Sequence, residues 1–188
     1  MKVSDSDTYL FKQVKKGRPQ ALAVLFEKYY EPLCNFAFLF LKDEKITEEI
    51  VDDVFIHIWR KRDELRIHSN LKAYLYQSTR NGVISYFRKN NPEMESVEKT
   101  ENLENPLPSV SPETLMIRKE IASKVTNLLE KLPAQAGLVF RMHKMDGLKY
   151  KEIAEILNIS VKTVENHMGR ALKIFRLMYE KNASFFDD

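Results

Sequence analysis

The chain has 188 residues, of which 44% are hydrophobic and 30% are charged. This composition excludes an intrinsically disordered chain, and the length suits one or two small domains. The formal net charge is only +3, so any contact with nucleic acid must depend on local clusters of basic residues. A single cysteine, Cys34, excludes an internal disulfide framework and fits a reducing compartment.

An all-α fold is expected, because glycine is scarce at five residues and no stretch alternates apolar and polar residues as a strand does. The N-terminal region lacks the apolar core of a signal peptide. The longest apolar stretch, Leu33 to Leu41, is too short to span a bilayer. We therefore predict a cytoplasmic protein with no direct membrane insertion.

Two helices are predicted at the start of the chain. A short apolar stripe predicts a first helix that ends at Gly17. Pro19 suits the first turn of a longer helix that runs to Leu41. Because this second helix is apolar on much of its surface, we place it at the centre of the first domain. Pro32 is expected to bend or split it, since proline lacks the backbone N–H.

The third predicted helix combines an apolar stripe with an acidic exposed side, and the segment that follows is basic. The stripe runs from Ile46 to Trp59. Residues 41–58 contain six acidic and two basic side chains, whereas residues 60–90 contain eight basic and two acidic ones. A run of carboxylates is most often a solvated helix face, so by itself it leaves open whether this side contacts a partner.

The basic segment consists of a polar loop, Lys61 to Asn70, and a predicted helix, Leu71 to Lys89, that is rich in aromatic residues. Basic groups interleaved with aromatic rings suit single-stranded nucleic acid, because rings stack on bases and charges follow the backbone. The alternative is that the rings belong to the core of a helical bundle. We favour the core for Tyr74, and leave both interpretations open for Tyr86 and Phe87.

Residues 92–112 contain four prolines and five glutamates against one lysine, and they show no apolar periodicity. This composition predicts an acidic, proline-containing linker. It separates a domain of residues 1–91 from a domain of residues 113–188.

The second domain is predicted to contain a helix that Pro133 stops, a helix from Ala134 to Met145, and a helix-turn-helix from Tyr150 to Arg176. The last assignment depends on two amphipathic patterns separated by about three residues. Ser160 suits the N-cap of the second helix of this pair. The apolar stripe of that helix consists of Val164, Met168, Ala171, Leu172 and Phe175.

The opposite side of that helix carries residue types that donate to phosphates and to base edges in the major groove, namely Lys162, Thr163, Asn166 and Arg170. Residues 131–176 contain nine basic and four acidic side chains, so this part is basic although the whole chain is nearly balanced. Taken alone, the pattern leaves open an ordinary helical hairpin with a solvated polar face.

Three stretches of the chain together resemble the extracytoplasmic-function sigma factors, the smallest initiation factors of bacterial RNA polymerase. The stretches are Thr47 to Trp59; Leu71 to Tyr76 followed by Arg80-Asn81 and Tyr86 to Arg88; and Leu132-Pro133 followed by Tyr150 to Ala154 and Ser160 to Glu165. Each stretch alone is a weak signal, but their order and spacing are specific and cover nearly the whole chain. Two residues depart from the family pattern: Asp52 stands where glutamine is usual, and Ser85 stands where aspartate is common.

The resemblance implies a sigma factor that binds core polymerase and directs promoter-specific initiation of transcription, with an anti-sigma factor as a further partner. It implies a region 2-like domain at residues 1–91 and a region 4-like helix-turn-helix domain at residues 113–188. The acidic helix would dock on the clamp of the largest polymerase subunit through Glu49, Asp52 and Asp53. The promoter element near the start site, held open as a melted strand, would be contacted by Lys61, Arg62, Arg66, Asn70, Asn81, Tyr86 and Arg88. The distal element, read as duplex DNA, would be contacted by Ser160, Lys162, Thr163, Asn166, His167 and Arg170.

Other classes of function have less support in the residues. The four histidines are scattered without the spacing of a metal site, and no glycine-rich phosphate loop or nucleophile motif is present. We therefore predict no metal, no cofactor and no enzymatic activity. The main alternative is a helix-turn-helix activator or repressor that does not bind core polymerase. A helical interaction protein without a DNA function fits less well, because two separate basic clusters are present.

Overall fold

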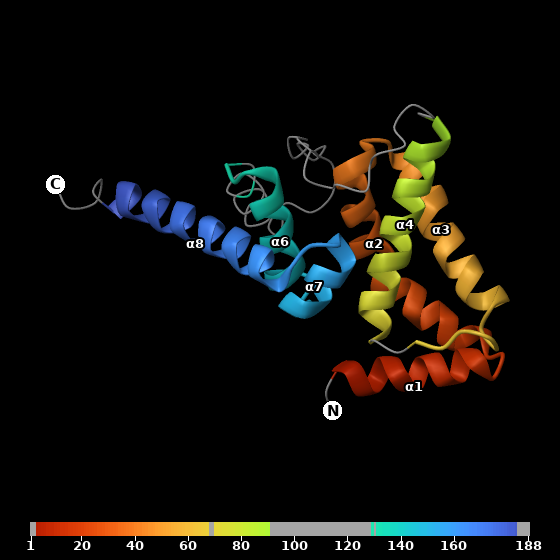
Figure 1. The fold of residues 1–188 in the computed structure, drawn as a ribbon. Coiled ribbons are helices and arrows are strands. Elements are labelled where there is room, and N and C mark those ends of the chain that lie inside the picture. The colour runs from red at the N-terminus through yellow and green to blue at the C-terminus, as the bar shows by residue number, and fades with distance from the viewer. Residues whose placement is uncertain (1–2, 68–69, 91–128, 130, 184–188) are drawn as a thin grey trace, which may run out of the picture. The chain divides into compact units, whose positions relative to one another are not determined.

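The computed structural model describes residues 3–67, 70–90, 129 and 131–183 of the chain (Figure 1). These residues form seven α-helices and no strand, which confirms the prediction of an all-α fold. The chain divides into two compact units, residues 1–100 and 101–188, and each unit is described by itself. The predicted linker, residues 92–112, and most of the helix expected before Pro133 lie outside the described residues.

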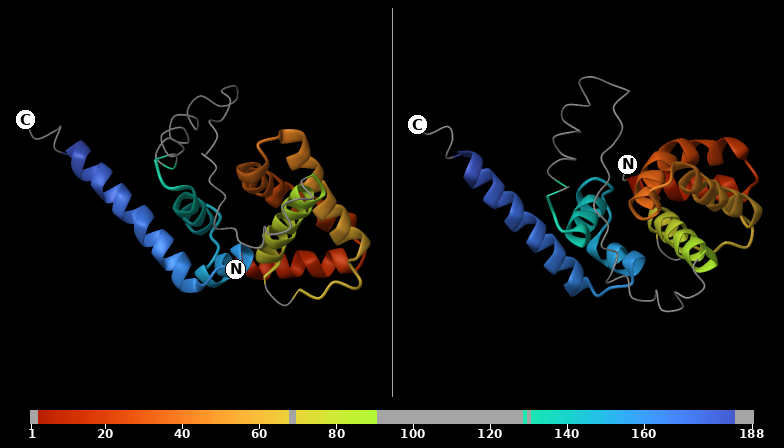
Figure 2. Two further views of the ribbon diagram at one scale, coloured as in Figure 1. Left: turned by 45° about the horizontal axis from the view of Figure 1, so that its top comes forward. Right: turned by 90° about the horizontal axis from the view of Figure 1, so that it is seen from above.

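Unit 1 contains four helices, which are α1 (Val3–Lys15), α2 (Pro19–Leu41), α3 (Glu44–Arg60) and α4 (Leu71–Asn90). The two views of Figure 2 show α1, α3 and α4 gathered around α2, and α2 contacts all three. Its side chains supply much of the core, with Leu25, Leu33 and Phe36 almost completely buried. The central position predicted for this helix is therefore confirmed.

The ends of α1 and α2 follow local signals. Gly17 has a φ of 73°, a left-handed conformation that glycine adopts without a steric penalty, and it ends α1 as predicted. Pro19 is the first residue of α2, where its missing N–H costs nothing. The helix then continues through Pro32 without a break, so of the expected bend or split, the split does not occur. Tyr29 and Leu33 on either side of this proline are buried, and their packing offsets the lost hydrogen bond.

A buried polar cluster joins α1 to α2. The carboxylate of Asp7 is 5% exposed and accepts hydrogen bonds from the Tyr29 hydroxyl and the Lys28 ammonium group. Burial, together with the hydrogen bond to Asp7 and its charge, raises the pKa of Tyr29 above its ordinary value. A buried carboxylate with two donors is a stable arrangement, whereas the same group without them is costly.

The side chain of Asp43 caps α3 by accepting a bond from the Ile46 backbone N–H at 3.0 Å. The packing of α3 against α4 depends on one glycine. In the middle of α4, a Cβ atom added to Gly82 would lie 2.7 Å from Cγ2 of Ile50 on α3. Only glycine permits this close approach of the two helices.

Unit 2 contains α6 (Ala134–Lys144), α7 (Tyr150–Leu157) and α8 (Val161–Ala183), and α7 with α8 forms the predicted helix-turn-helix. Asn158 ends α7 in a left-handed conformation with a φ of 56°. The hydroxyl of Ser160 accepts a bond from the Thr163 backbone N–H at 3.0 Å, so its predicted role as N-cap is confirmed. The long helix α8 continues seven residues beyond the predicted limit of Arg176.

One residue of the predicted apolar stripe of α8 is misplaced. Val164, Met168 and Ala171 are buried, but Leu172 is 50% exposed. Phe175 packs as predicted against a cluster that includes Leu132 and Ala136, and Ile174, which was not predicted, joins it there. Ala171 faces the centre of this core, and the next residue along a helix points about 100° away from it.

Candidate functional site

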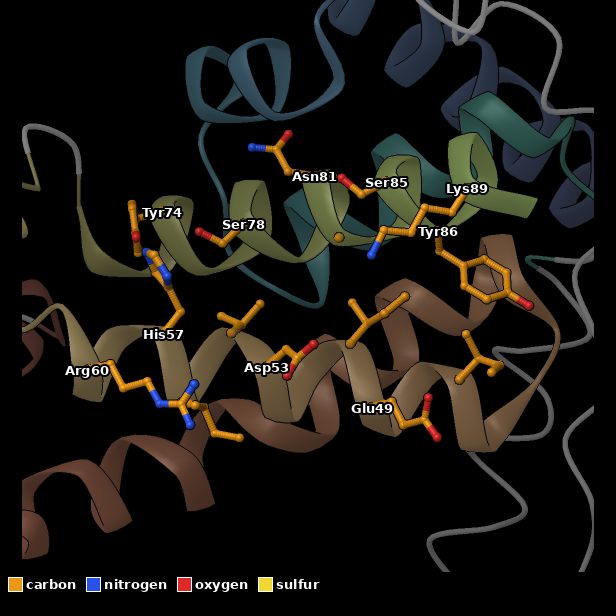
Figure 3. Close-up of a pocket in the computed structure, with 15 residues that line it drawn as sticks. Glu49, Asp53, His57, Arg60, Tyr74, Ser78, Asn81, Ser85, Tyr86 and Lys89 are labelled. Carbon is orange, nitrogen blue, oxygen red and sulfur yellow. The ribbon is translucent and has the colours of Figure 1, made fainter. Parts of the chain in front are cut away.

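A groove of about 780 Å³ lies between α3 and α4 in unit 1 (Figure 3). Its polar lining comes from residues one or two turns apart on each helix, so that each set shares one side. From α3 these are Glu49, Asp53, His57 and Arg60, and from α4 they are Tyr74, Ser78, Asn81, Ser85, Tyr86 and Lys89. The apolar base includes Ile46, Ile50 and Val54, beside Gly82. The close contact of Gly82 with Ile50 sets how near the two walls stand.

The groove brings together residues from two of the predicted sites. Glu49 and Asp53, expected to contact polymerase, line one wall, while Asn81 and Tyr86, expected to contact promoter DNA, line the other (Figure 3). The α3 wall thus carries two carboxylates beside His57 and Arg60, and the α4 wall carries hydroxyl, amide and aromatic groups with Lys89 among them. A ligand in this groove would meet both predicted sites at once.

Asp52 is exposed one turn after Glu49 on α3 but does not line the groove, and its charge acts on residues of α2. Burial raises the pKa of Tyr30 to about 12, and the negative charges of Asp52 and Glu48 add to that shift. Burial likewise raises the pKa of the Cys34 thiol to about 11, again with contributions from Glu48 and Asp52. The three predicted polymerase contacts therefore occupy a broad exposed face of α3 rather than one cluster, and Cys34 remains a protonated thiol at neutral pH.

The loop between α3 and α4 contains predicted DNA contacts with different surroundings. A guanidinium nitrogen of Arg62 donates to the Trp59 carbonyl at 2.7 Å, and the guanidinium lies over the Trp59 ring. The side-chain oxygen of Asn70 accepts from the Ala73 backbone N–H at 2.7 Å, which caps α4. Lys61 forms an exposed ion pair with Glu64 at 3.0 Å, and Arg66 is exposed. Arg62 and Asn70 thus shape the loop, whereas Lys61 and Arg66 present charge to solvent.

The predicted contacts on α4 lie towards the groove or the solvent. Asn81 and Arg88 are exposed, and Tyr86 is half-buried with its ring 5.8 Å from that of Phe87. Tyr74, expected in the core, is also half-buried and lines the groove. A half-buried ring beside exposed polar groups leaves an aromatic surface on which a base can stack.

The predicted recognition helix α8 presents its polar residues as expected from helical spacing. Lys162, Asn166 and Arg170 are exposed, while Thr163 and His167 are half-buried. The hydroxyl of Ser160 bonds to both the backbone and the side chain of Thr163, so both residues stabilise the first turn. Burial, together with the positive charge of Arg170, lowers the pKa of His167, so its neutral imidazole offers one donor and one acceptor at neutral pH.

Most residues of the groove were not predicted as site residues, including Ser85 and Lys89 on its α4 wall. His57, Arg60 and Ser78 line its polar walls, and Ile56 is an apolar side chain that remains 44% exposed beside them. Their spacing is a signal that was available, since His57 follows Asp53 by one turn and Ser78 precedes Asn81 by three residues. Which helix faces which could not be read from that spacing.

Two features are absent from the part of the chain that the structure describes. No three His, Cys, Asp or Glu side chains there are grouped so that they could hold a metal ion. No described helix is long and apolar enough to cross a membrane.

Two family descriptions match the chain in the order in which its units occur. Sigma-70 region 2 matches residues 25–93, which include most of α2 with α3 and α4, and Sigma-70, region 4, matches residues 122–174, which include α6, α7 and part of α8. The groove lies in the first match and the helix-turn-helix in the second.

Individual proteins are similar to the chain over most of its length. The ECF RNA polymerase sigma-E factor of Escherichia coli (strain K12) is 28% identical over 174 residues, covering 88% of this chain and 90% of that protein. The ECF RNA polymerase sigma factor SigW of Bacillus subtilis (strain 168) is 28% identical over 172 residues, covering 88% and 92%.

Two solved structures share the fold. CnrH in complex with the cytosolic domain of CnrY has a TM-score of 0.59 at 21% identity, covering 94% of this chain and 99% of that one. The sigma factor RpoE of Bartonella quintana, in complex with the anti-sigma factor NepR, has a TM-score of 0.56 at 21% identity, covering 84% and 96%.

Proposed function

The chain belongs to the extracytoplasmic-function group of the sigma-70 family, and we propose that it binds core RNA polymerase and directs it to specific promoters. The observation that carries this proposal is the ordered pair of matches, region 2 over the groove-bearing helices and region 4 over the helix-turn-helix. Its role is binding rather than catalysis, and it acts where polymerase acts, in the bacterial cytoplasm.

The exposed face of α3 is proposed as the contact with core polymerase. Glu49, Asp52 and Asp53 are all exposed, and residues 41–58 carry six acidic against two basic side chains. Charges of one sign on one face raise the rate of encounter with an oppositely charged surface and fix its orientation. Ile56 lies among these carboxylates and adds an apolar surface that a partner can bury.

The α3–α4 loop and α4 are proposed to hold the promoter strand near the start site. Tyr86 offers a ring for stacking, which is worth roughly 1–3 kcal/mol per base, and Arg88 and Asn81 offer donors beside it. In the loop, Lys61 and Arg66 would contact the strand, while Arg62 and Asn70 hold the loop in shape through their bonds to Trp59 and Ala73. A melted strand exposes its bases to such contacts, whereas a duplex does not.

The helix α8 is proposed to read the distal promoter element in the major groove. Lys162, Asn166 and Arg170 stand exposed along it, and these residue types bond to phosphates and to purine edges. Ser160 and Thr163 stabilise the start of the helix through the cap. The neutral imidazole of His167 is a further candidate for a base contact.

An anti-sigma factor is proposed as a second protein partner. The supporting observation is that a chain of the same fold, RpoE of Bartonella quintana, was solved in complex with its anti-sigma factor. A protein bound over the groove would cover Glu49 and Asn81 together and so block contacts to polymerase and to DNA at once.

The test of the proposed function is run-off transcription with purified core polymerase and a library of upstream sequences from the same genome. We expect the chain to stimulate initiation from a small set of promoters that share two sequence elements. Tight binding of the chain alone to duplex DNA, without any stimulation of core polymerase, would instead identify an activator or repressor.

A further inference from the structure

Gly169 is an unexpected residue within the helix α8. It is exposed, and a Cβ atom built on it would meet nothing within 4 Å outside its own stretch of helix among the described residues. Glycine in a helix interior is less favourable than alanine, because it loses more backbone freedom on folding. The described residues of unit 2 therefore supply no packing reason for a glycine at this position. Gly82 differs in this respect, since α3 leaves no room for a side chain there.

Helical spacing defines the surroundings of Gly169. Glu165 and Asn166 lie one turn before it, and Leu172 and Lys173 lie one turn after it. All four side chains are exposed. Gly169 is therefore a gap in an exposed face, with the Asn166 amide and the Glu165 carboxylate on one side and the Lys173 ammonium group and Leu172 on the other, and a surface that approaches this face can come close to the helix backbone.

We propose that Gly169 lets the backbone of α8 approach a DNA strand at the edge of the major groove more closely than any side chain would permit. The inference rests on the proposed function of α8 as the reader of the distal promoter element. Contacts with phosphate and sugar set the register of a recognition helix, so a closer approach brings Asn166 and Arg170 towards the base edges. Exposed Lys173 on this face favours DNA over a protein as the occupant, because it neutralises phosphate, and Lys162 can exchange its exposed ion pair with Glu165 at 3.2 Å for a phosphate contact.

The experiment compares Gly169→Ala and Gly169→Leu with a matched control, Glu180→Leu. Position 180 is exposed on nearly the same side of α8, about 16 Å further along the helix axis. Each full-length variant is combined with core polymerase, and its affinity is measured for promoters that the wild-type holoenzyme selects. Affinity for core polymerase and thermal unfolding of unit 2 are measured in parallel.

Stability and binding should change in opposite directions. Gly169→Ala should raise the unfolding temperature of unit 2 by about 4 °C, because alanine favours the helix. It should nevertheless weaken promoter binding by about tenfold, the equivalent of one good base contact, and Gly169→Leu by on the order of a hundredfold. The loss should be similar for all promoters, whereas Glu180→Leu, which removes a carboxylate and the ion-pair partner of Arg176, should not weaken binding.

Three results would overturn the inference. Unchanged promoter binding by Gly169→Leu, with an active wild-type holoenzyme, would refute the role of Gly169 and leave the proposed function intact. Loss of core binding with DNA contacts retained would assign this face to a protein. A wild-type chain that directs no initiation would refute both the inference and the proposed function.

Discussion

Replacing Gly82 with alanine should destabilise unit 1, although alanine is the better helix former. A Cβ atom at this position would lie 2.7 Å from Cγ2 of Ile50, whereas carbon atoms pack best at about 3.5–4.0 Å. The added methyl group is thus roughly 1 Å too close. The Ile50 methyl group cannot swing aside easily, because a β-branched side chain in a helix has one strongly preferred rotamer.

Two opposing terms set the expected size of the effect. Overpacking of this kind costs about 1–3 kcal/mol, and the exchange of glycine for alanine within a helix gains about 1 kcal/mol. The net result is a loss of about 1 kcal/mol, with an upper limit near 2 kcal/mol. If Ile50 is first replaced by alanine, the clash disappears, and Gly82→Ala should then stabilise unit 1 by about 1 kcal/mol.

Urea unfolding followed by fluorescence measures this change, because the only tryptophan, Trp59, lies in α3 of unit 1. The matched control is Gly169→Ala, which places the same methyl group in open space on α8 and should leave the Trp59 transition unchanged. The reasoning is refuted if Gly82→Ala stabilises unit 1 in the presence of Ile50. An unchanged slope against urea would show that the midpoint shift reflects stability.

Three further predictions concern the proposed contacts and the buried cluster. Asp53→Lys should weaken binding to core polymerase at least tenfold in a competition assay, because it reverses a charge on the proposed contact face. Glu27→Lys, which is also exposed but lies on α2, should not weaken this binding. Equal losses of affinity in the two variants would place the contact elsewhere. Arg170→Ala should cost about 1–3 kcal/mol of affinity for the distal element and relax selectivity at one base pair, measured by selection from a randomised promoter library. A uniform loss across sequences would instead make Arg170 a phosphate contact. Tyr29→Phe should destabilise unit 1 by about 1–3 kcal/mol, because the buried carboxylate of Asp7 loses a donor. The pKa of Tyr29 is raised above 10.0 in the folded state, so the stability that its protonated hydroxyl contributes is present below pH 10 and is lost as the pH rises further. In a pH series of urea midpoints, the Tyr29→Phe variant should therefore lose less stability above pH 10 than the wild type.

Most of the helical architecture was predictable because its signals are local. Gly17 and Pro19 mark the boundary between α1 and α2, and Ser160 begins α8, each through the conformation or hydrogen bond of that residue alone. Apolar residues at helical spacing likewise predicted the buried sides of α3 and α7 without knowledge of their neighbours. The resemblance to the sigma family also depended on the linear order of short stretches.

The chain by itself therefore determined where helices form and which family they belong to, while the tertiary structure decided which side chains share a site. Spacing along α3 did not indicate that Glu49 and Asp53 line the groove with α4 while Asp52 does not, because that depends on which helix packs on each side. It also did not indicate that Arg62 binds the Trp59 carbonyl or that Leu172 lies outside the core. Periodicity predicts that one side of a helix is buried, but the width and occupants of that side are set by contacts between residues far apart in the sequence.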